Sequence, residues 1–148
     1  MIRRSILVLI AAFALAALIE AAATPQDKKP QDKSSSSGWT LPPDADTQKN
    51  PLTVDEKVLN AGKAVFKKNC TRCHGPAGLG DGEDADPDAR EKMDLTNPKG
   101  ADRNSDGVVF HKVWNGRRKP KMPAFKDEGL TEQQVWSVVA YVQTLRKK

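Results

Sequence analysis

The stretch Cys70-Thr71-Arg72-Cys73-His74 contains the only two cysteines of the 148-residue chain and places a histidine directly after the second. This C-x-x-C-H order is typical of the attachment site of a c-type haem. Two thiols on one helical turn can each add to a vinyl group of the same porphyrin, and the next residue can then bind the iron through its imidazole. The motif therefore predicts one covalent haem c, held by Cys70 and Cys73, with His74 as an iron ligand.

Two other uses of a C-x-x-C pair fit this sequence less well. A structural zinc site needs four ligands, and outside the motif the chain offers one further histidine, His111, and no cysteine. A thioredoxin-like redox pair lies at a strand-to-helix turn, whereas no strand pattern precedes Cys70. Haem attachment is therefore the best interpretation of the motif.

Residues 1–23 have the pattern of an export signal. Arg3 and Arg4 supply positive charge, residues 6–19 form an apolar run, and residues 21–23 are alanines of the kind that a signal peptidase accepts. The run is shorter than the ~20 residues that span a bilayer, which favours a cleaved signal peptide over an uncleaved anchor. Since c-type haem is attached outside the bacterial cytoplasmic membrane, we expect a periplasmic or exported protein, tethered to the membrane only if this segment is retained.

The next segment, residues 24–50, is rich in Pro, Ser, Lys, Asp and Gln. Its apolar content is too low to offset the entropy of ordering a chain, so the composition predicts a flexible linker. Trp39 and Leu41 are the residues in it that could fold back on the domain. The remaining residues, 51–148, suffice for one small domain, and a buried porphyrin would supply much of its core.

An amphipathic helix is expected at each end of this domain. Thr53 and Glu56 have the spacing of a capping box, and an apolar stripe at three- and four-residue intervals then leads into the haem motif; its members are Val58, Leu59, Gly62, Val65, Phe66 and Cys70. Thr131 and Gln134 repeat the capping pattern before a last helix, whose apolar face contains Val135, Val138, Val139, Val142 and Leu145.

A third, shorter helix is expected over Val108–Trp114, where Asn115 and Gly116 form a C-cap signal. No alternation of apolar and polar residues long enough for a strand occurs in the sequence. The sequence therefore predicts an all-α domain with long loops. Long loops are unusual in so small a domain, but a haem for them to surround would account for their length.

Taken together, these features resemble the class I cytochromes c, which are single-haem electron carriers. The likeness covers residues 57–145 and rests on the haem motif and on five further segments, which are 75–82, 94–96, Gly116, 121–125 and 138–142. The resemblance implies a cytochrome c fold of three to five helices around one haem. Its first and last helices would cross where Gly62 and Phe66 meet Tyr141.

The resemblance also implies that His74 is the proximal iron ligand and Met122 the distal one. A thioether suits low-spin iron and raises its reduction potential relative to a second histidine. Pro123 restricts Met122 to an extended backbone, so a loop would present the sulfur. The competing sixth ligands are Met93 and His111, and an open or water-bound iron is a further alternative.

With both axial positions filled, the iron would bind no substrate, so the resemblance implies a one-electron carrier and not an enzyme. We expect redox proteins as partners and a monomeric chain. Two alternatives stay open. The first is a haem-bearing subunit or docking module of a larger oxidoreductase, which the linker of residues 24–50 would suit. The second is a haem enzyme or gas sensor with an open distal side.

Charge is unevenly placed in this chain of net charge +5. Residues 81–94 hold seven acidic side chains, whereas residues 112–126 hold six basic ones and no acid. Since the basic run flanks Met122, it would border the haem edge and steer an acidic partner. Nucleic acid is not an expected partner of an exported protein whose other basic residues are interleaved with acids.

Residues 102–107 repeat the first half of a calcium-binding EF-hand loop. The twelfth position of that loop should be a bidentate glutamate, but this chain has Val113 there. Without it, a cation would lose two of its oxygen ligands. Asp106 is therefore interpreted as the cap of the helix that begins near Val108 and not as a calcium ligand.

Overall fold

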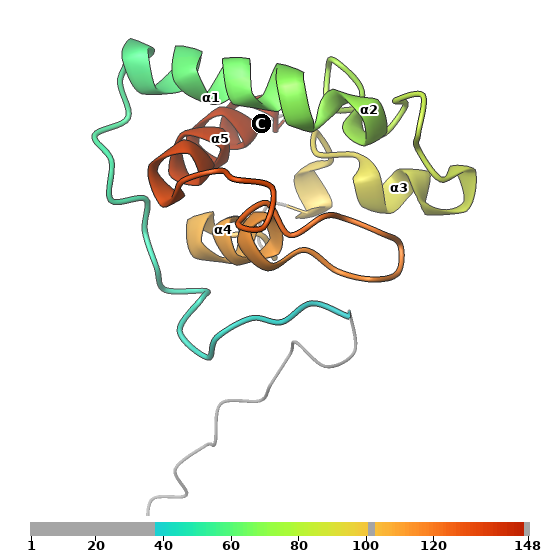
Figure 1. The fold of residues 1–148 in the computed structure, drawn as a ribbon, viewed down its shortest axis with the longest axis horizontal. Coiled ribbons are helices and arrows are strands. Elements are labelled where there is room, and N and C mark those ends of the chain that lie inside the picture. Colours follow the sequence, from blue (N-terminus) through green and yellow to red (C-terminus); the bar gives the residue numbers. More distant parts are fainter. Residues whose placement is uncertain (1–37, 101–102, 147–148) are drawn as a thin grey trace, which may run out of the picture.

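The computed structural model describes residues 38–100 and 103–146, which form helices joined by loops and no β-strand (Figure 1). The predicted all-α class is therefore confirmed. The elements are α1 (Glu56–Asn69), α2 (Thr71–His74), η1 (Pro87–Ala89), α3 (Arg90–Met93), η2 (Pro98–Gly100), α4 (Asp106–Asn115) and α5 (Glu132–Leu145). None of these helices is long and apolar enough to cross a membrane. The predicted signal peptide and the first part of the predicted linker lie outside the described residues.

Helices α1 and α5 cross in direct contact, as the sequence predicts (Figure 1). Gly62 is buried at the crossing, and a Cβ added there would stand 2.0 Å from the carbonyl oxygen of Ser137. Beside this point, the rings of Phe66 and Tyr141 pack with their centroids 5.3 Å apart. The crossing fixes the two terminal helices, and α4 packs on α5 to complete the core.

The first turn of α1 differs from the prediction. The helix begins at Glu56, and Oδ1 of Asp55 accepts the hydrogen bond of the Val58 N–H at 2.8 Å. Thr53 is exposed and lies two residues before this cap, so the predicted capping box of Thr53 and Glu56 is wrong. Aspartate is at least as good an N-cap as threonine, and its position next to the helix decides which of the two is used.

The other two predicted helices are confirmed. In α5, the capping box of Thr131 and Gln134 is present. Helix α4 ends at the predicted Gly116, which has a φ of 61°, but it begins two residues earlier than expected. Asp106 is therefore in the first turn and is not the cap. Its two carboxylate oxygens accept hydrogen bonds from Gln143 Nε2 at 2.8 Å and from the Asn50 N–H at 3.2 Å.

Residues 38–50, which we call the strap, lie along α4 and do not extend away from the domain (Figure 1). Ala45 is buried, and its carbonyl oxygen would be 2.4 Å from a Cβ added to Gly107. The Gly107 N–H donates to the Gln48 carbonyl at 3.2 Å, and Asn50 Nδ2 donates to the Trp136 carbonyl at 2.8 Å. The packed part of the chain thus begins before the boundary at residue 51 that the composition predicts.

Candidate functional site

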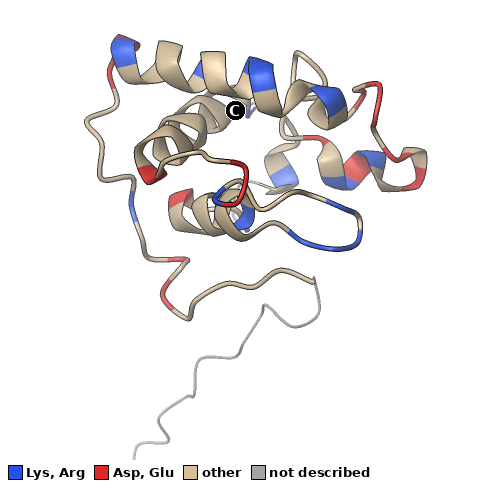
Figure 2. Ribbon diagram, in the orientation of Figure 1, with Lys and Arg blue, Asp and Glu red and all other residues tan. Residues whose placement is uncertain are grey.

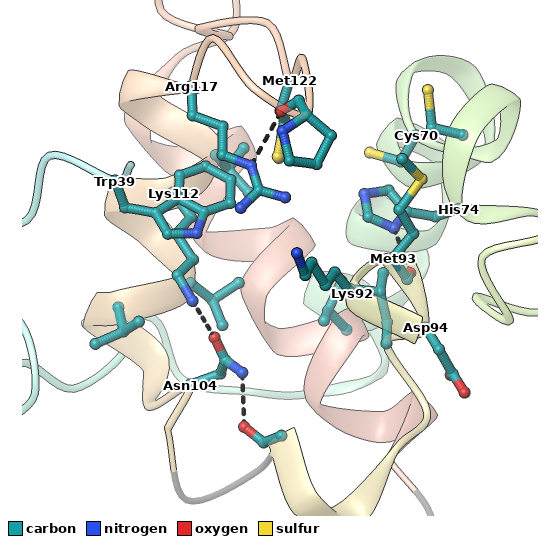
Figure 3. A pocket seen from close by; sticks show the side chains of 18 of the residues that line it. Trp39, Cys70, His74, Lys92, Met93, Asp94, Asn104, Lys112, Arg117 and Met122 are labelled. Atoms are coloured by element: carbon teal, nitrogen blue, oxygen red, sulfur yellow. Dashed lines mark hydrogen bonds between the residues drawn. The ribbon is translucent and has the colours of Figure 1, made fainter. Parts of the chain in front are cut away.

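A cavity of about 910 Å³ lies between α2 with α3 on one side and the loop after α4 on the other (Figure 3). The four residues that the sequence singles out, Cys70, Cys73, His74 and Met122, all line it. Core residues of α1, α4 and α5 form its apolar floor, namely Phe66, Val109, Val113, Val138 and Val142. The volume falls within the range of about 300–1,000 Å³ that is usual for small-molecule and cofactor sites.

One wall of the cavity is the short helix α2. Helix α1 ends at Asn69, and the chain turns at Cys70 into α2, which ends at His74. His74 Nδ1 donates a hydrogen bond of 2.7 Å to the Met93 carbonyl oxygen. This bond places the ring proton on Nδ1, so that Nε2 keeps a lone pair. A ring held in this way has the form that binds metals.

The surroundings of His74 favour its neutral form. Burial lowers the pKa of its imidazole, and the positive charge of Arg117 lowers it further, while the hydrogen bond to Met93 opposes the shift. Burial also raises the pKa of the Cys70 thiol to about 12, with a smaller contribution from Cys73. A thiol with such a pKa is not a reactive thiolate, which argues against a thioredoxin-like redox pair.

Met122 lies on the wall opposite His74 in Figure 3. The loop that presents it is pinned by two backbone hydrogen bonds with Arg117, of 2.9 and 3.0 Å. Two residues beyond Pro123, the side chain of Phe125 is buried and its N–H donates to the Val113 carbonyl at 3.1 Å. The position of Met122 is thus set by its loop and by α4.

Of the two competing ligands, Met93 lines the cavity on the same side as His74, and His111 does not line it. Met93 is buried beside His74, and its carbonyl holds the imidazole (Figure 3). His111 does not line the cavity; its Nε2 lies 3.0 Å from Gln48 Oε1, and its ring packs edge-on against Phe110. Neither residue shares the wall formed by Met122. Within the described ranges, no group of three or more His, Cys, Asp or Glu side chains could hold a metal ion.

The basic run around Met122 predicts a positively charged edge of the cavity, and the structure adds an aromatic ring to that edge. Trp39 of the strap lies between two cations, with the Arg117 guanidinium carbon 4.2 Å and Lys112 Nζ 5.4 Å from its ring centroid (Figure 3). Lys112 Nζ also donates to Asn104 Oδ1. Burial lowers the pKa of Lys112 to about 8, helped by the positive charges of Arg117, Arg103 and Arg146. Trp39 and Leu41, the two linker residues that could fold back on the domain, both line the cavity.

Comparisons with known proteins place these features in context. A family model described as "Cytochrome c" matches residues 59–146. Among solved structures, a chain of the reducing HAO-like protein complex of Kuenenia stuttgartiensis is 31% identical with a TM-score of 0.51, and the match covers 66% of this chain and 47% of that one. Cytochrome CL of the marine methylotrophic bacterium Methylophaga aminisulfidivorans is 23% identical with a TM-score of 0.46, over 62% and 57%. The chain thus spans about half of these solved chains, and none of the curated proteins matches it.

Proposed function

Because the chain belongs to the cytochrome c family, whose domains transfer electrons through haem, we propose that it is a one-electron carrier with a single haem c. Cys70 and Cys73 would hold the haem through two thioether bonds. His74 would bind the iron through Nε2, and Met122 would bind it through sulfur from the other side. When bound, the haem supplies an iron that alternates between the ferrous and ferric states.

The residues of the cavity fit this group in three ways. Its floor is apolar and its volume is that of a cofactor site. The His74 hydrogen bond to Met93 leaves Nε2 as the nitrogen able to bind iron, and a neutral imidazole is the form that binds. A soft sulfur on the opposing wall suits low-spin iron. The opposition of His74 and Met122 across one cavity is the observation that carries the proposal.

The chain's own residues would limit the motion that accompanies electron transfer. His74 is restrained by Met93, and Met122 is held by the paired backbone hydrogen bonds with Arg117. The first restraint joins the His74 ring to a backbone carbonyl, and the second joins two backbone segments, so neither needs a second side chain as partner. Occupation of both axial positions would exclude a substrate from the iron, so the protein itself would catalyse nothing.

A potentiometric titration of the purified, exported chain tests the proposal. We expect a mass increased by one haem and a reversible transition that follows a one-electron Nernst curve. Cys70→Ser with Cys73→Ser should abolish covalent attachment, since the chain has no other cysteine. A parent protein without covalent haem, or a ferrous form that binds carbon monoxide at once, would refute the carrier.

We further propose that the partner docks on the loop between α4 and α5. Arg118, Lys119, Lys121 and Lys126 are exposed on this loop, and the cations gather along it in Figure 2. Lys119 and Lys121 also line the cavity, so the charge lies at its mouth. A concentrated positive charge raises the encounter rate with an acidic surface.

Charge reversal tests this docking surface, with ferricyanide as an anionic electron acceptor. Lys119→Glu with Lys121→Glu should slow the oxidation of the ferrous protein at low salt by about tenfold or more, and added salt should remove the difference. The matched control is Lys63→Glu with Lys67→Glu, two exposed positions on α1. Equal slowing by both pairs would contradict a localised docking surface.

A second candidate is a haem-bearing subunit of a larger complex. It is favoured by the 31% identity with a chain of the reducing HAO-like protein complex of Kuenenia stuttgartiensis. Purification of the native protein at low salt distinguishes the two. A partner retained at fixed stoichiometry through successive columns would establish the subunit, whereas a monomer free of partners would establish the shuttle. Cytochrome c domains are typically exported, and the pattern of residues 1–23 supports a periplasmic site for either one.

A further inference from the structure

The strap lies outside the region that defines the family. The family model begins at residue 59, whereas Gly38, Trp39, Leu41 and Asp46 of the strap all line the cavity. The strap is fastened to α4 along its length: Asn115 Nδ2 donates to the Thr40 carbonyl at 3.2 Å near one end, and Gln48 contacts His111 near the other. A segment that composition identifies as a linker therefore forms part of the wall of the site.

Its contribution to the cavity is the ring of Trp39. The Arg117 guanidinium carbon and Lys112 Nζ both lie within 5.4 Å of this ring centroid (Figure 3), which is within the range of a cation–π contact. Arg117 is further fixed because its Nε donates to the Pro120 carbonyl at 3.0 Å. The nitrogens at the tip of this guanidinium are therefore the ones available to a ligand in the cavity.

The cations of this edge have few carboxylates near them: Asp46 acts on Lys112, and Asp106 acts on Arg146. Cavity-lining cations outnumber acids by seven to two; they are Lys92, Arg103, Lys112, Arg117, Lys119, Lys121 and Arg146, against Asp46 and Asp94. Asp94 Oδ1 already accepts two hydrogen bonds from Thr96. Within the described part of the chain, neither Arg117 nor Lys112 forms a salt bridge with a carboxylate. Half-buried cations that repel each other are costly unless an anion lies between them.

We propose that Trp39 is a positioning residue that holds Arg117 and Lys112 against the propionate carboxylates of the haem. This inference rests on the proposed function, because it needs haem in the cavity. Haem carries two propionates, which are carboxylates like those that Arg and Lys pair with in proteins. The strap thereby becomes part of the cofactor site. The nearby cations lower the pKa of the propionates, so that the propionates stay ionised at a lower pH than they would in water.

The pH dependence of the reduction potential tests the proposal, because the charge of a propionate near the iron alters the potential as it titrates. In the haem-loaded parent we expect a potential that is flat through neutral pH, with its inflection at acidic pH. Arg117→Gln should move the inflection up by about 1–3 pH units, which is the usual effect of losing one nearby opposite charge. It should also lower the potential at neutral pH, since a lost positive charge favours the ferric state.

Arg118→Gln is the matched control for Arg117→Gln. Arg118 is the next residue, is exposed, and does not line the cavity, so its profile should follow that of the parent. Arg117→Lys keeps the charge and should restore most of the parent profile. Trp39→Leu removes the ring that fixes the guanidinium and should shift the inflection in the same direction as Arg117→Gln, while Trp39→Phe should shift it less.

Two results would overturn the proposal. One is the same pH profile for Arg117→Gln and Arg118→Gln. The other is an unshifted profile for Trp39→Leu, and this comparison holds even if Arg117→Gln fails to retain haem. A parent chain that acquires no covalent haem would instead refute the proposed function, so the two failures are distinguishable.

Discussion

The close backbone approach of α1 and α5 at Gly62 allows a quantitative prediction for Gly62→Ala. A methyl group at this position would lie 2.0 Å from the Ser137 carbonyl oxygen and 2.6 Å from its carbon. Because ordinary contact begins at 3.4 Å, the two helices must separate by about 1.4 Å or tilt. Both atoms of Ser137 belong to the backbone of α5, so no side-chain rotation can relieve the contact.

The size of the destabilisation follows from two effects that lower the stability and one that raises it. Overpacking of a rigid contact costs about 1–3 kcal/mol, and a displacement of this size places the cost at the upper end. Separation of the helices also weakens the ring contact of Phe66 with Tyr141, which contributes about 0.5–1.5 kcal/mol. Alanine in place of glycine returns about 1 kcal/mol of helix propensity. We therefore expect Gly62→Ala to lower the free energy of unfolding by about 2.5–3.5 kcal/mol.

Urea unfolding of the haem-loaded protein, followed by far-ultraviolet circular dichroism, measures this loss as a lower midpoint with an unchanged slope. Ala64→Gly is the control, since Ala64 is exposed on the same helix and this reverse change should cost only the propensity of about 1 kcal/mol. A Gly62→Ala protein as stable as the parent, or more stable, would refute the close crossing of α1 and α5.

Two further predictions concern the N-terminus of α1 and the fastening of the strap. Asp55→Ala should destabilise the protein by about 1 kcal/mol through loss of the helix cap, whereas Thr53→Ala should change the stability by less than about 0.5 kcal/mol; urea midpoints that rank the two in the opposite order would contradict the observed cap. Burial lowers the pKa of His111, partly opposed by Asp44, so the unfolded chain binds the extra proton first as the pH falls below about 6.5. Stability should therefore decrease from about pH 6.5 downward, and His111→Gln should reduce this slope in urea unfolding at several pH values; an unchanged slope would count against a lowered pKa of the half-buried His111.

Much of the fold follows from local sequence signals. The capping box at Thr131, the C-cap at Gly116 and the apolar stripe of α1 each act within a few residues, so spacing alone locates the helices. Signals of equal strength compete at short range, however. Thr53 and Asp55 are both good caps, and the structure uses the one that directly precedes the helix.

The sequence predicts only part of the candidate site. The motif at Cys70 and the loop at Met122 are visible in the sequence, but the acceptor that orients His74 is a backbone carbonyl, which any residue could provide. The packing of the strap against the domain cannot be predicted from the sequence for a related reason. It is held mainly by backbone and amide hydrogen bonds from residues such as Gln48 and Asn50, and polar residues of this kind are equally typical of a flexible linker.

A near-infrared spectrum of the oxidised protein tests whether His74 and Met122 are the axial ligands of the iron. We expect a weak sulfur-to-iron charge-transfer band in the parent, its loss in Met122→Ala, and its retention in Met93→Ala and His111→Gln. A high-spin parent spectrum, or a band that survives Met122→Ala, would contradict ligation by Met122 and favour an open or differently ligated iron.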